Sequence, residues 1–163
     1  MKIYHLTRTQ FLPITLAEAW TFFSSPKNLA QITPPGIGFK VLYISGNQSE
    51  IYAGQIIRYK IKILPGVTVN WMTEITHVNK PYNFIDEQRF GPYAFWHHQH
   101  HFKEVQGGTE ITDELNYAIP FGFIGRISHV LFVERSINDI FDYRFKVLEK
   151  LFASNPLVTE KMV

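Results

Sequence analysis

A run of four histidines, His97-His98-Gln99-His100-His101, is the strongest chemical signal in the chain. If this segment is a strand, neighbouring side chains point to opposite faces, so only His98 and His100 share the face of interest. Two imidazoles beside a carboxylate could hold a metal ion in a three-ligand site with one open position, and Asp86 or Asp113 could supply the carboxylate. Neither a helical His-Glu-x-x-His motif nor a cysteine spacing reinforces this interpretation. The sequence therefore predicts no metal and no other cofactor.

The same inward-facing histidines also suit acid–base chemistry. An unperturbed imidazole has a pKa of about 6.5, so His98 or His100 held by Asp86 or Asp113 could transfer protons near neutral pH. Alternatively, these groups satisfy one another or orient a bound molecule. Nucleophilic catalysis has no support, because the chain has no cysteine and no Gly-x-Ser-x-Gly motif. The candidate catalytic residues are therefore His98, His100 and Asp86.

The composition is that of one globular domain with an unusual share of rings. Of 163 residues, 45% are hydrophobic and 18% charged, and a chain of this length can bury a sizeable core. The 15% aromatic content favours a cavity lined by rings, although an ordinary core uses the same residues. The formal net charge is only +2 and the basic residues are scattered, so we expect no nucleic-acid binding.

Signals for export or membrane insertion are missing from the sequence. The first residues, 1–8, lack the apolar core of a signal peptide. The longest apolar stretch, 121–133, contains Arg126 and His129 and is shorter than the ~20 residues that a membrane span requires. The absence of cysteine gives no sign of an oxidising compartment. We therefore expect a cytoplasmic protein without a membrane span.

The hydrophobic periodicity predicts an α+β domain. A capping box at Thr15–Glu18 begins one short helix, Ser25-Pro26 begins a second, and a helical pattern extends over 122–152. Short Gly- and Pro-containing turns join the expected strands, which implies antiparallel pairing. A curved sheet of about seven strands wrapped around the long C-terminal helix satisfies this order. We expect one domain over 1–152 and a disordered tail over 153–163. The expected strands are 2–11, 38–45, 54–64, 67–78, 82–90, 94–105 and 109–119.

Alternation around the Gly107-Gly108 turn predicts which face of the sheet looks inward. A two-residue hairpin loop at these glycines would place His100 opposite Leu115. The face that these residues share is rich in rings and aliphatic groups, whereas the other face is polar, so the first face looks inward. Polar groups there need partners or a ligand. The predicted ligand contacts are Tyr59, Trp71, Phe84, Asp86, Gln88, Trp96, His98, His100 and Tyr117, with Ile127 and Leu131 from the helix.

Several segments spread along the chain form a recognisable set: Pro26-Lys27-Asn28-Leu29, Ile32-Thr33-Pro34-Pro35, Phe84-Ile85-Asp86-Glu87-Gln88, Gly91-Pro92-Tyr93, Ile140-Phe141 and Tyr143-Arg144, with Trp71, Trp96, His98, His100, Phe102, Gly108-Thr109, Asp113, Tyr117 and Pro120. Together they resemble the START-like or SRPBCC superfamily of ligand-binding proteins, and in particular a bacterial branch known as SRPBCC ligand-binding proteins. The resemblance covers roughly residues 1–152. It implies the helix-grip fold, in agreement with the periodicity.

What the resemblance implies about function is broad. Relatives in the superfamily include lipid carriers, plant hormone and pollen-allergen-like binders, and aromatic polyketide cyclases. The sequence favours a non-catalytic protein that binds a small aromatic or lipid-like molecule between the sheet and the helix. The alternatives are a polyketide cyclase or dehydratase-like enzyme with His98 or His100 as general base, and an interaction module whose cavity is filled by its own rings. Tyr143-Arg144 is interpreted as an anchor of the helix, with ligand contact as the alternative. A homodimer is left open.

Overall fold

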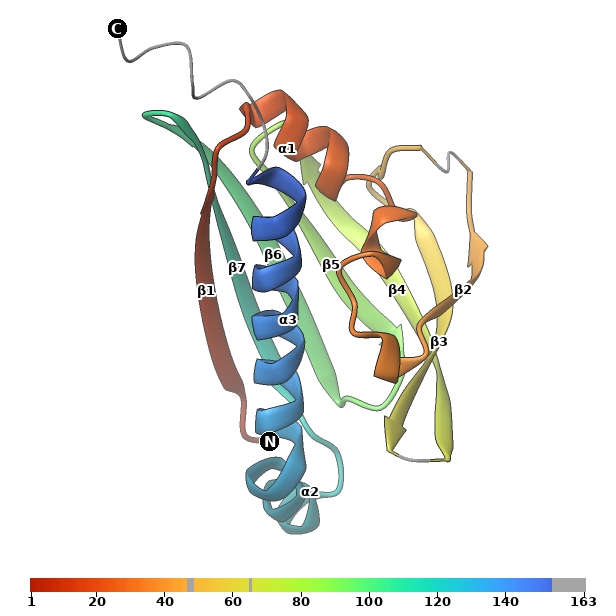
Figure 1. Cartoon of the computed structure of the whole chain (residues 1–163). Coiled ribbons are helices and arrows are strands. Elements are labelled where there is room, and N and C mark those ends of the chain that lie inside the picture. The colour runs from red at the N-terminus through yellow and green to blue at the C-terminus, as the bar shows by residue number, and fades with distance from the viewer. Residues whose placement is uncertain (47–48, 65, 154–163) are drawn as a thin grey trace, which may run out of the picture.

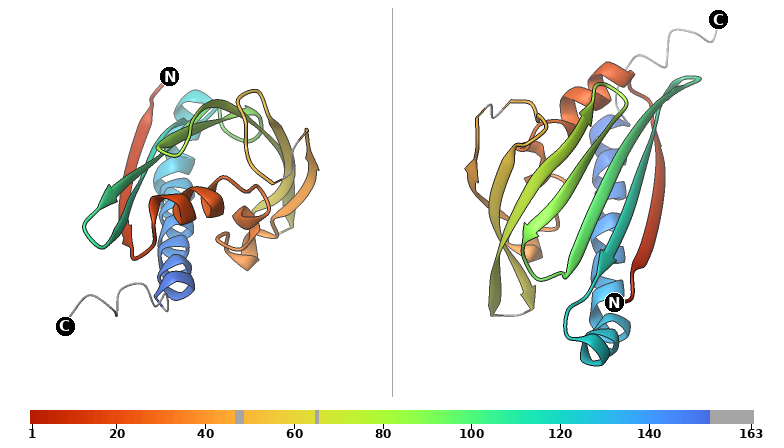
Figure 2. Two further views of the ribbon diagram at one scale, coloured as in Figure 1. Left: turned by 90° about the horizontal axis from the view of Figure 1, so that it is seen from above. Right: turned by 180° about the vertical axis from the view of Figure 1, so that it is seen from behind.

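A computed structural model describes the chain except for residues 47–48, 65 and 154–163. Seven antiparallel strands form one sheet in the order β1-β7-β6-β5-β4-β3-β2. The sheet curves around a long C-terminal helix, which confirms the predicted helix-grip architecture (Figures 1 and 2). Of the predicted disordered tail, 153–163, residues 154–163 lie outside the described residues. The strands are β1 (Tyr4–Leu12), β2 (Lys40–Ile44), β3 (Ile56–Leu64), β4 (Val67–Asn79), β5 (Asn83–Phe90), β6 (Phe95–Val105) and β7 (Gly108–Ala118).

Three short elements connect β1 to β2 on the helix side of the sheet: α1 (Leu16–Phe23) and two 3-10 turns, η1 (Asn28–Ala30) and η2 (Pro35–Ile37) (Figure 1). The predicted capping box begins α1. The Thr15 hydroxyl accepts from the Glu18 amide at 3.2 Å, and the Glu18 carboxylate accepts from the Thr15 amide at 2.8 Å. These reciprocal bonds satisfy backbone donors that a helix start leaves open.

The predicted C-terminal helix consists of α2 (Gly122–Ser128), a π-helical turn η3 (His129–Val133) and α3 (Glu134–Phe152). A π-turn holds one residue more than an α-turn, so it rotates the preceding helix face by about 100° relative to the following one. Ile137 and Leu148 are therefore buried, whereas Ile127 and Leu131 are 46% and 59% exposed. The prediction that Ile127 and Leu131 face inward from the helix is wrong. Within the described residues, no helix combines the length and apolarity needed to cross a membrane.

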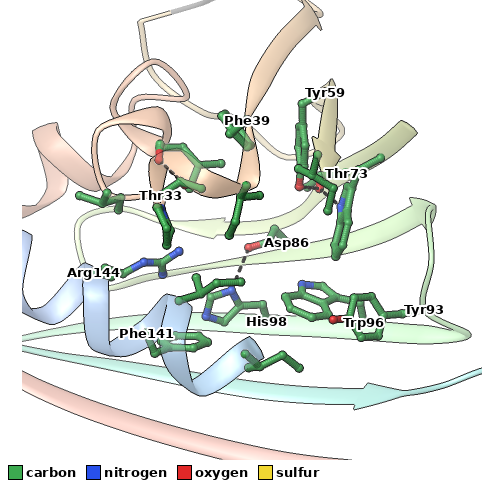
Figure 3. Close-up of a pocket in the computed structure, with 18 of the residues that line it drawn as sticks. Thr33, Phe39, Tyr59, Thr73, Asp86, Tyr93, Trp96, His98, Phe141 and Arg144 are labelled. Atoms are coloured by element: carbon green, nitrogen blue, oxygen red, sulfur yellow. Dashed lines mark hydrogen bonds and ion pairs between the residues drawn. The ribbon is translucent and has the colours of Figure 1, made fainter. Parts of the chain in front are cut away.

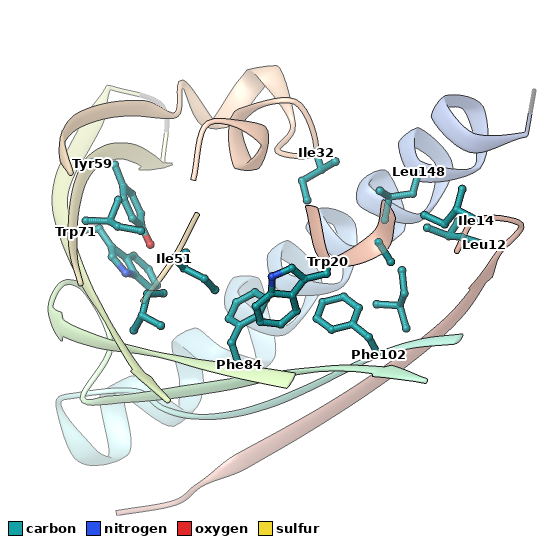
Figure 4. Packing of buried hydrophobic residues seen from close by; sticks show 14 residues of the cluster. Leu12, Ile14, Trp20, Ile32, Ile51, Tyr59, Trp71, Phe84, Phe102 and Leu148 are labelled. Atoms are coloured by element: carbon teal, nitrogen blue, oxygen red, sulfur yellow. The ribbon is translucent and has the colours of Figure 1, made fainter. Parts of the chain in front are cut away.

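The core on the α1 side of the sheet is built around Trp20, which is 2% exposed (Figure 4). Its ring meets Phe84 and Phe102 edge-on, with centroids 6.1 and 6.0 Å apart. Its indole Nε1 donates to Glu50 Oε1 at 2.6 Å. Trp20 thus fastens α1 to the middle of the concave face while its polar edge stays satisfied.

The β6–β7 hairpin differs from the prediction in its loop. The loop is Gln106-Gly107, because Val105 pairs with Gly108 and Gly107 takes the left-handed conformation with φ of +83°. Gly108 belongs to the strand instead. A Cβ at Gly108 would collide with the carbonyl oxygen of Leu12 on the neighbouring strand, so this glycine permits close strand contact rather than a turn.

This change of loop shifts the β6–β7 pairing by two residues. His100 lies opposite Asp113, where the sequence prediction placed Leu115. Side chains alternate with a period of two, so a shift of two keeps every residue on its predicted face. The inward-facing set therefore remains as predicted, but its cross-strand partners change, and an imidazole now stands beside a carboxylate.

Candidate functional site

A cavity of about 640 Å³ lies between the concave face of the sheet, the 3-10 turns and the C-terminal helix. Its walls are mainly aromatic and aliphatic, with a few polar groups gathered on the sheet (Figure 3). An apolar hollow of this size with few convergent polar groups is the usual form of a small-molecule site. Seven of the predicted ligand contacts line it, namely Tyr59, Trp71, Phe84, Asp86, Trp96, His98 and His100.

Two other predicted contacts, Gln88 and Tyr117, lie outside the cavity lining. The Gln88 amide donates to the carbonyl of Tyr93 at 2.7 Å and accepts from its N–H at 3.2 Å, which holds the connection between β5 and β6. The Tyr117 ring lies behind Trp96, and its hydroxyl is 2.8 Å from His129 Nε2. Burial raises the pKa of Tyr117 to about 12, so the phenol stays neutral. Both residues support the wall from behind.

The last two predicted contacts, Ile127 and Leu131, point outward because of the π-turn. Ser128, Phe132 and Val133 from the same segment line the cavity instead. Phe121 and Phe132 line the cavity and are also largely exposed, so they lie at its rim. The other exposed apolar side chains of this segment do not line the cavity: Phe123, Ile124, Ile127, Val130 and Leu131.

The aromatic wall is formed by rings from β3, β4 and the start of β6. Trp71 and Trp96 meet edge-on with centroids 5.0 Å apart, and Tyr59 stacks on Trp71 at 5.9 Å. The Thr73 hydroxyl accepts from Trp71 Nε1 at 3.0 Å and lies 2.8 Å from the Tyr59 hydroxyl. Burial raises the pKa of Tyr59 far above its usual value, so this wall offers contact area and no charge.

A charged cluster lies on the neighbouring strands β5, β6 and β7. Asp86 is opposite His98 on β6, and Asp113 on β7 is opposite His100. His98 Nε2 lies 2.9 Å from Asp113 Oδ1, and His100 Nε2 lies 2.9 Å from Asp86 Oδ2. The two histidine side chains are 6% and 9% exposed, so these contacts are shielded from water. The strand register brings together the residues that the sequence placed on one face.

The cluster separates the pKa values of its members. Burial would raise the pKa of Asp113, but hydrogen bonds from His100 and His98 outweigh it and hold that pKa well below its usual value. Burial likewise opposes ionisation of Asp86, yet the contact with His100 lowers its pKa. Burial and the neighbouring His100 lower the pKa of His98, whereas the two carboxylates overcome burial and raise the pKa of His100. These shifts favour the ionised form of both aspartates and make His100 a more basic imidazole than His98.

Arg144 reaches into the cavity from α3, towards Asp86 and His98 (Figure 3). Its side chain is 11% exposed, and its Nη1 lies 3.7 Å from Asp113 Oδ1, beyond hydrogen-bond distance. The guanidinium carbon lies 5.1 Å from the centre of the Phe141 ring. Within the part of the chain that the structure describes, Arg144 makes no hydrogen bond, and its buried Nε has no acceptor. The interpretation of Arg144 as a hydrogen-bonding anchor of the helix is therefore not supported.

Sequence reasoning thus placed most strand residues of the site and missed the segment before β2. Thr33 and Phe39, next to the 3-10 turns, line the cavity. Arg144, for which ligand contact was only the alternative to a helix anchor, lines it as well. A charged residue in a helix face otherwise rich in apolar groups fits a snorkelling surface residue equally well.

No protein-family model and no curated protein matches the sequence. Solved structures with low identity share the fold. The di-domain ARO/CYC BexL from the BE-7585A biosynthetic pathway superposes with a TM-score of 0.70 at 13% identity, over 94% of this chain and 51% of BexL. TTHA0849 from Thermus thermophilus superposes with a TM-score of 0.67 at 17% sequence identity, and the match covers 93% of this chain and 100% of TTHA0849. Ara h 8.0201 superposes with a TM-score of 0.59 at 15% sequence identity, and the match covers 94% of this chain and 100% of Ara h 8.0201.

These structures establish the class of fold to which the chain belongs. Seven antiparallel strands around a C-terminal helix, in the arrangement that BexL and Ara h 8.0201 share, define the START-like or SRPBCC helix-grip fold. The resemblance predicted from the sequence is confirmed at the level of the fold.

Proposed function

We propose that this protein binds a small apolar molecule, aromatic or lipid-like, that carries one acceptor oxygen or anionic group. The observation that carries the proposal is Arg144, a cation without a hydrogen bond among the described residues, inside a cavity walled by rings. A buried donor without an acceptor costs about 1–3 kcal/mol, and more for a charged group. A ligand oxygen on the guanidinium would recover this energy, while Trp71, Trp96 and Phe141 supply contact area.

Paired dyes test this proposal, because Trp71 and Trp96 line the cavity and report on its contents. Anilinonaphthalene sulfonate carries an anion, and N-phenylnaphthylamine has the same ring skeleton without one. Arg144→Met is expected to weaken sulfonate binding about tenfold or more, since hydrogen bonds to charged groups are worth about 1.5–3 kcal/mol. Binding of the neutral dye should change less than threefold. Fluorescence titration of both dyes measures the two affinities.

Arg135→Met is the matched control, because Arg135 lies on the same helix with a side chain that is 86% exposed. It should leave both affinities unchanged. Equal weakening of the two dyes by Arg144→Met would contradict an anion-anchoring role. Absence of binding of either dye to the wild type would argue that the cavity does not accept apolar molecules.

A second candidate function rests on the two histidines that line the cavity, each of which contacts a buried carboxylate. His98 or His100 could take a proton from a carbon next to a ligand carbonyl, and the electron pair would pass to the carbonyl oxygen, beside Arg144. This is the chemistry of a cyclase or dehydratase-like enzyme. Benzyl phenyl ketone in deuterated buffer tests it: NMR should show exchange of its CH₂ protons faster than in buffer alone. Exchange that persists in a His98→Gln/His100→Gln variant would contradict the role of these bases.

A further inference from the structure

Two carboxylates enclose the inward-facing imidazoles, and each carboxylate contacts one nitrogen of each ring. Asp113 Oδ1 lies 2.9 Å from His98 Nε2 and 2.8 Å from His100 Nδ1, although the second contact lacks hydrogen-bond alignment. Asp86 Oδ2 lies 2.9 Å from His100 Nε2 and 3.5 Å from His98 Nδ1. Two neutral imidazoles have two N–H groups for these four contacts. At two of them a nitrogen lone pair would face a carboxylate oxygen unless a cation lies between.

The charges of the cluster also leave room for a cation. Asp86 and Asp113 contribute two negative charges and Arg144 one positive charge, so the cluster carries one net negative charge with both imidazoles neutral. A buried charge without compensation is costly. A proton on one ring neutralises this charge. A divalent ion would turn it into one net positive charge, which an anionic group of the cavity's occupant at the open coordination position would balance.

The arrangement of the four residues distinguishes ligands from supporting groups. Asp86, His98 and His100 line the cavity, and one donor atom from each lies within 4.8 Å of the other two. Asp113 is not part of the cavity lining and contacts the imidazoles from the other side. A carboxylate that receives the far N–H of a ligating histidine is the usual support of a metal site, because it fixes the tautomer and the ring orientation.

Neighbouring rings hold the two imidazoles in place. Phe84 stacks on His100 with centroids 4.2 Å apart, and Phe141 meets His98 edge-on at 5.7 Å. Donor atoms around a tetrahedral ion with bonds of ~2.0–2.1 Å lie about 3.3 Å apart. The two imidazole nitrogens lie 2.9 and 3.5 Å from Asp86 Oδ2, so these two of the three donor–donor distances need little adjustment to accept an ion.

We propose that Asp86, His98 and His100 bind a divalent transition-metal ion, with Asp113 as the supporting acceptor behind the imidazoles. Two nitrogen donors and one carboxylate suit Zn²⁺ or Fe²⁺, whereas Mg²⁺ and Ca²⁺ prefer oxygen alone. Three protein ligands leave at least one coordination position open towards the cavity. An oxygen of the cavity's occupant, beside Arg144, would fit that position.

Zinc titration of chelator-treated protein by calorimetry tests the proposal. The wild type should bind one Zn²⁺ per chain and should not bind Mg²⁺. Asp86→Asn, His98→Gln and His100→Gln should each weaken Zn²⁺ binding about 100-fold or more, and Asp113→Asn about 10- to 100-fold. Imidazole ¹⁵N spectra should show one nitrogen of each of His98 and His100 shifting on zinc addition and the other keeping its proton.

The outward-facing histidines of the same strand provide the controls. His97→Gln and His101→Gln should leave zinc affinity unchanged, and loss of binding in either would reveal a surface site and overturn the proposal. Stoichiometric binding that survives Asp86→Asn would also overturn it, as would wild-type protein that takes up no zinc. If the cluster variants fail to fold, the ¹⁵N spectra of the wild type decide, because a proton and a metal ion shift a ring nitrogen differently.

The metal-site proposal and the ligand-binding proposal can be overturned independently of each other. Arg144→Met removes the proposed ligand anchor and leaves all three metal ligands in place, so its zinc affinity should stay within a few-fold of the wild type. Dye binding by protein that takes up no zinc would overturn the metal site alone. Zinc binding by protein that takes up neither dye would overturn the ligand proposal alone.

Discussion

Replacing Asp113 with alanine is expected to lower the free energy of unfolding by about 3–5 kcal/mol, because it removes one partner from a buried charged cluster. The carboxylate lies within 2.9 Å of both imidazoles and 3.7 Å from Arg144. Without it, Asp86 is the one carboxylate of the cluster left to balance Arg144 and the imidazoles, and His98 loses the acceptor of its Nε2–H. Urea unfolding of wild type and variant, both in the presence of a chelator, measures the difference.

Asp142→Ala is the matched control, because Asp142 is an exposed carboxylate on α3. Its effect should stay within about 0.5 kcal/mol. Asp113→Asn should cost less than Asp113→Ala, since the amide keeps the shape and one acceptor. A loss below about 1 kcal/mol for Asp113→Ala would show that water reaches the cluster and that the imidazoles do not depend on this carboxylate.

Trp20→Ala should cost a similar amount, about 3–5 kcal/mol, by a different mechanism. The substitution empties the space between Phe84 and Phe102 and leaves the Glu50 carboxylate without the indole donor. Cavity formation in a packed core forfeits both transfer energy and dispersion contacts. Thermal and urea unfolding should both report the loss.

Two further variants separate packing from hydrogen bonding at this position. Trp20→Phe keeps a ring on the sheet and should recover more than half of the loss. Glu50→Gln keeps an acceptor for the indole and should cost less than about 1 kcal/mol. If Trp20→Phe destabilises the protein as much as Trp20→Ala does, the packing role of the ring is contradicted. Trp20 does not line the cavity, so dye binding by the folded fraction should be retained.

The faces of the strands could be predicted because side-chain alternation depends only on local geometry. His98 and His100 lie on the same buried face whichever hairpin register is chosen. The cross-strand partner of His100 could not be predicted, because the sequence allowed the hairpin loop at either of two adjacent positions. The observed register places Gly108 close to Leu12 on β1, a strand about a hundred residues away in the chain. The pairing register of this hairpin therefore depends on a tertiary contact that the hairpin sequence alone does not contain.

The helix side of the site was less predictable than the sheet side. A π-turn has no strong local signature, and its extra residue sends Ile127 and Leu131 to the surface while Phe132 takes their place in the cavity. The direction in which the Arg144 side chain points depends in turn on how far the π-turn rotates α3 about its axis. The periodicity of a helix predicts its existence more reliably than the direction in which each side chain points.

The position of α3 in the chain has a consequence for the order in which the protein is made. All seven strands and α1 are synthesised before α3, so the concave sheet face lacks its long covering helix until residues 134–152 have left the ribosome. Arg144 and Phe141 reach the imidazoles and the aromatic wall only after α3 has been made. A nascent chain can therefore hold the paired strands with their histidines and carboxylates, but the closed cavity and its cationic group form together, when α3 packs on the sheet.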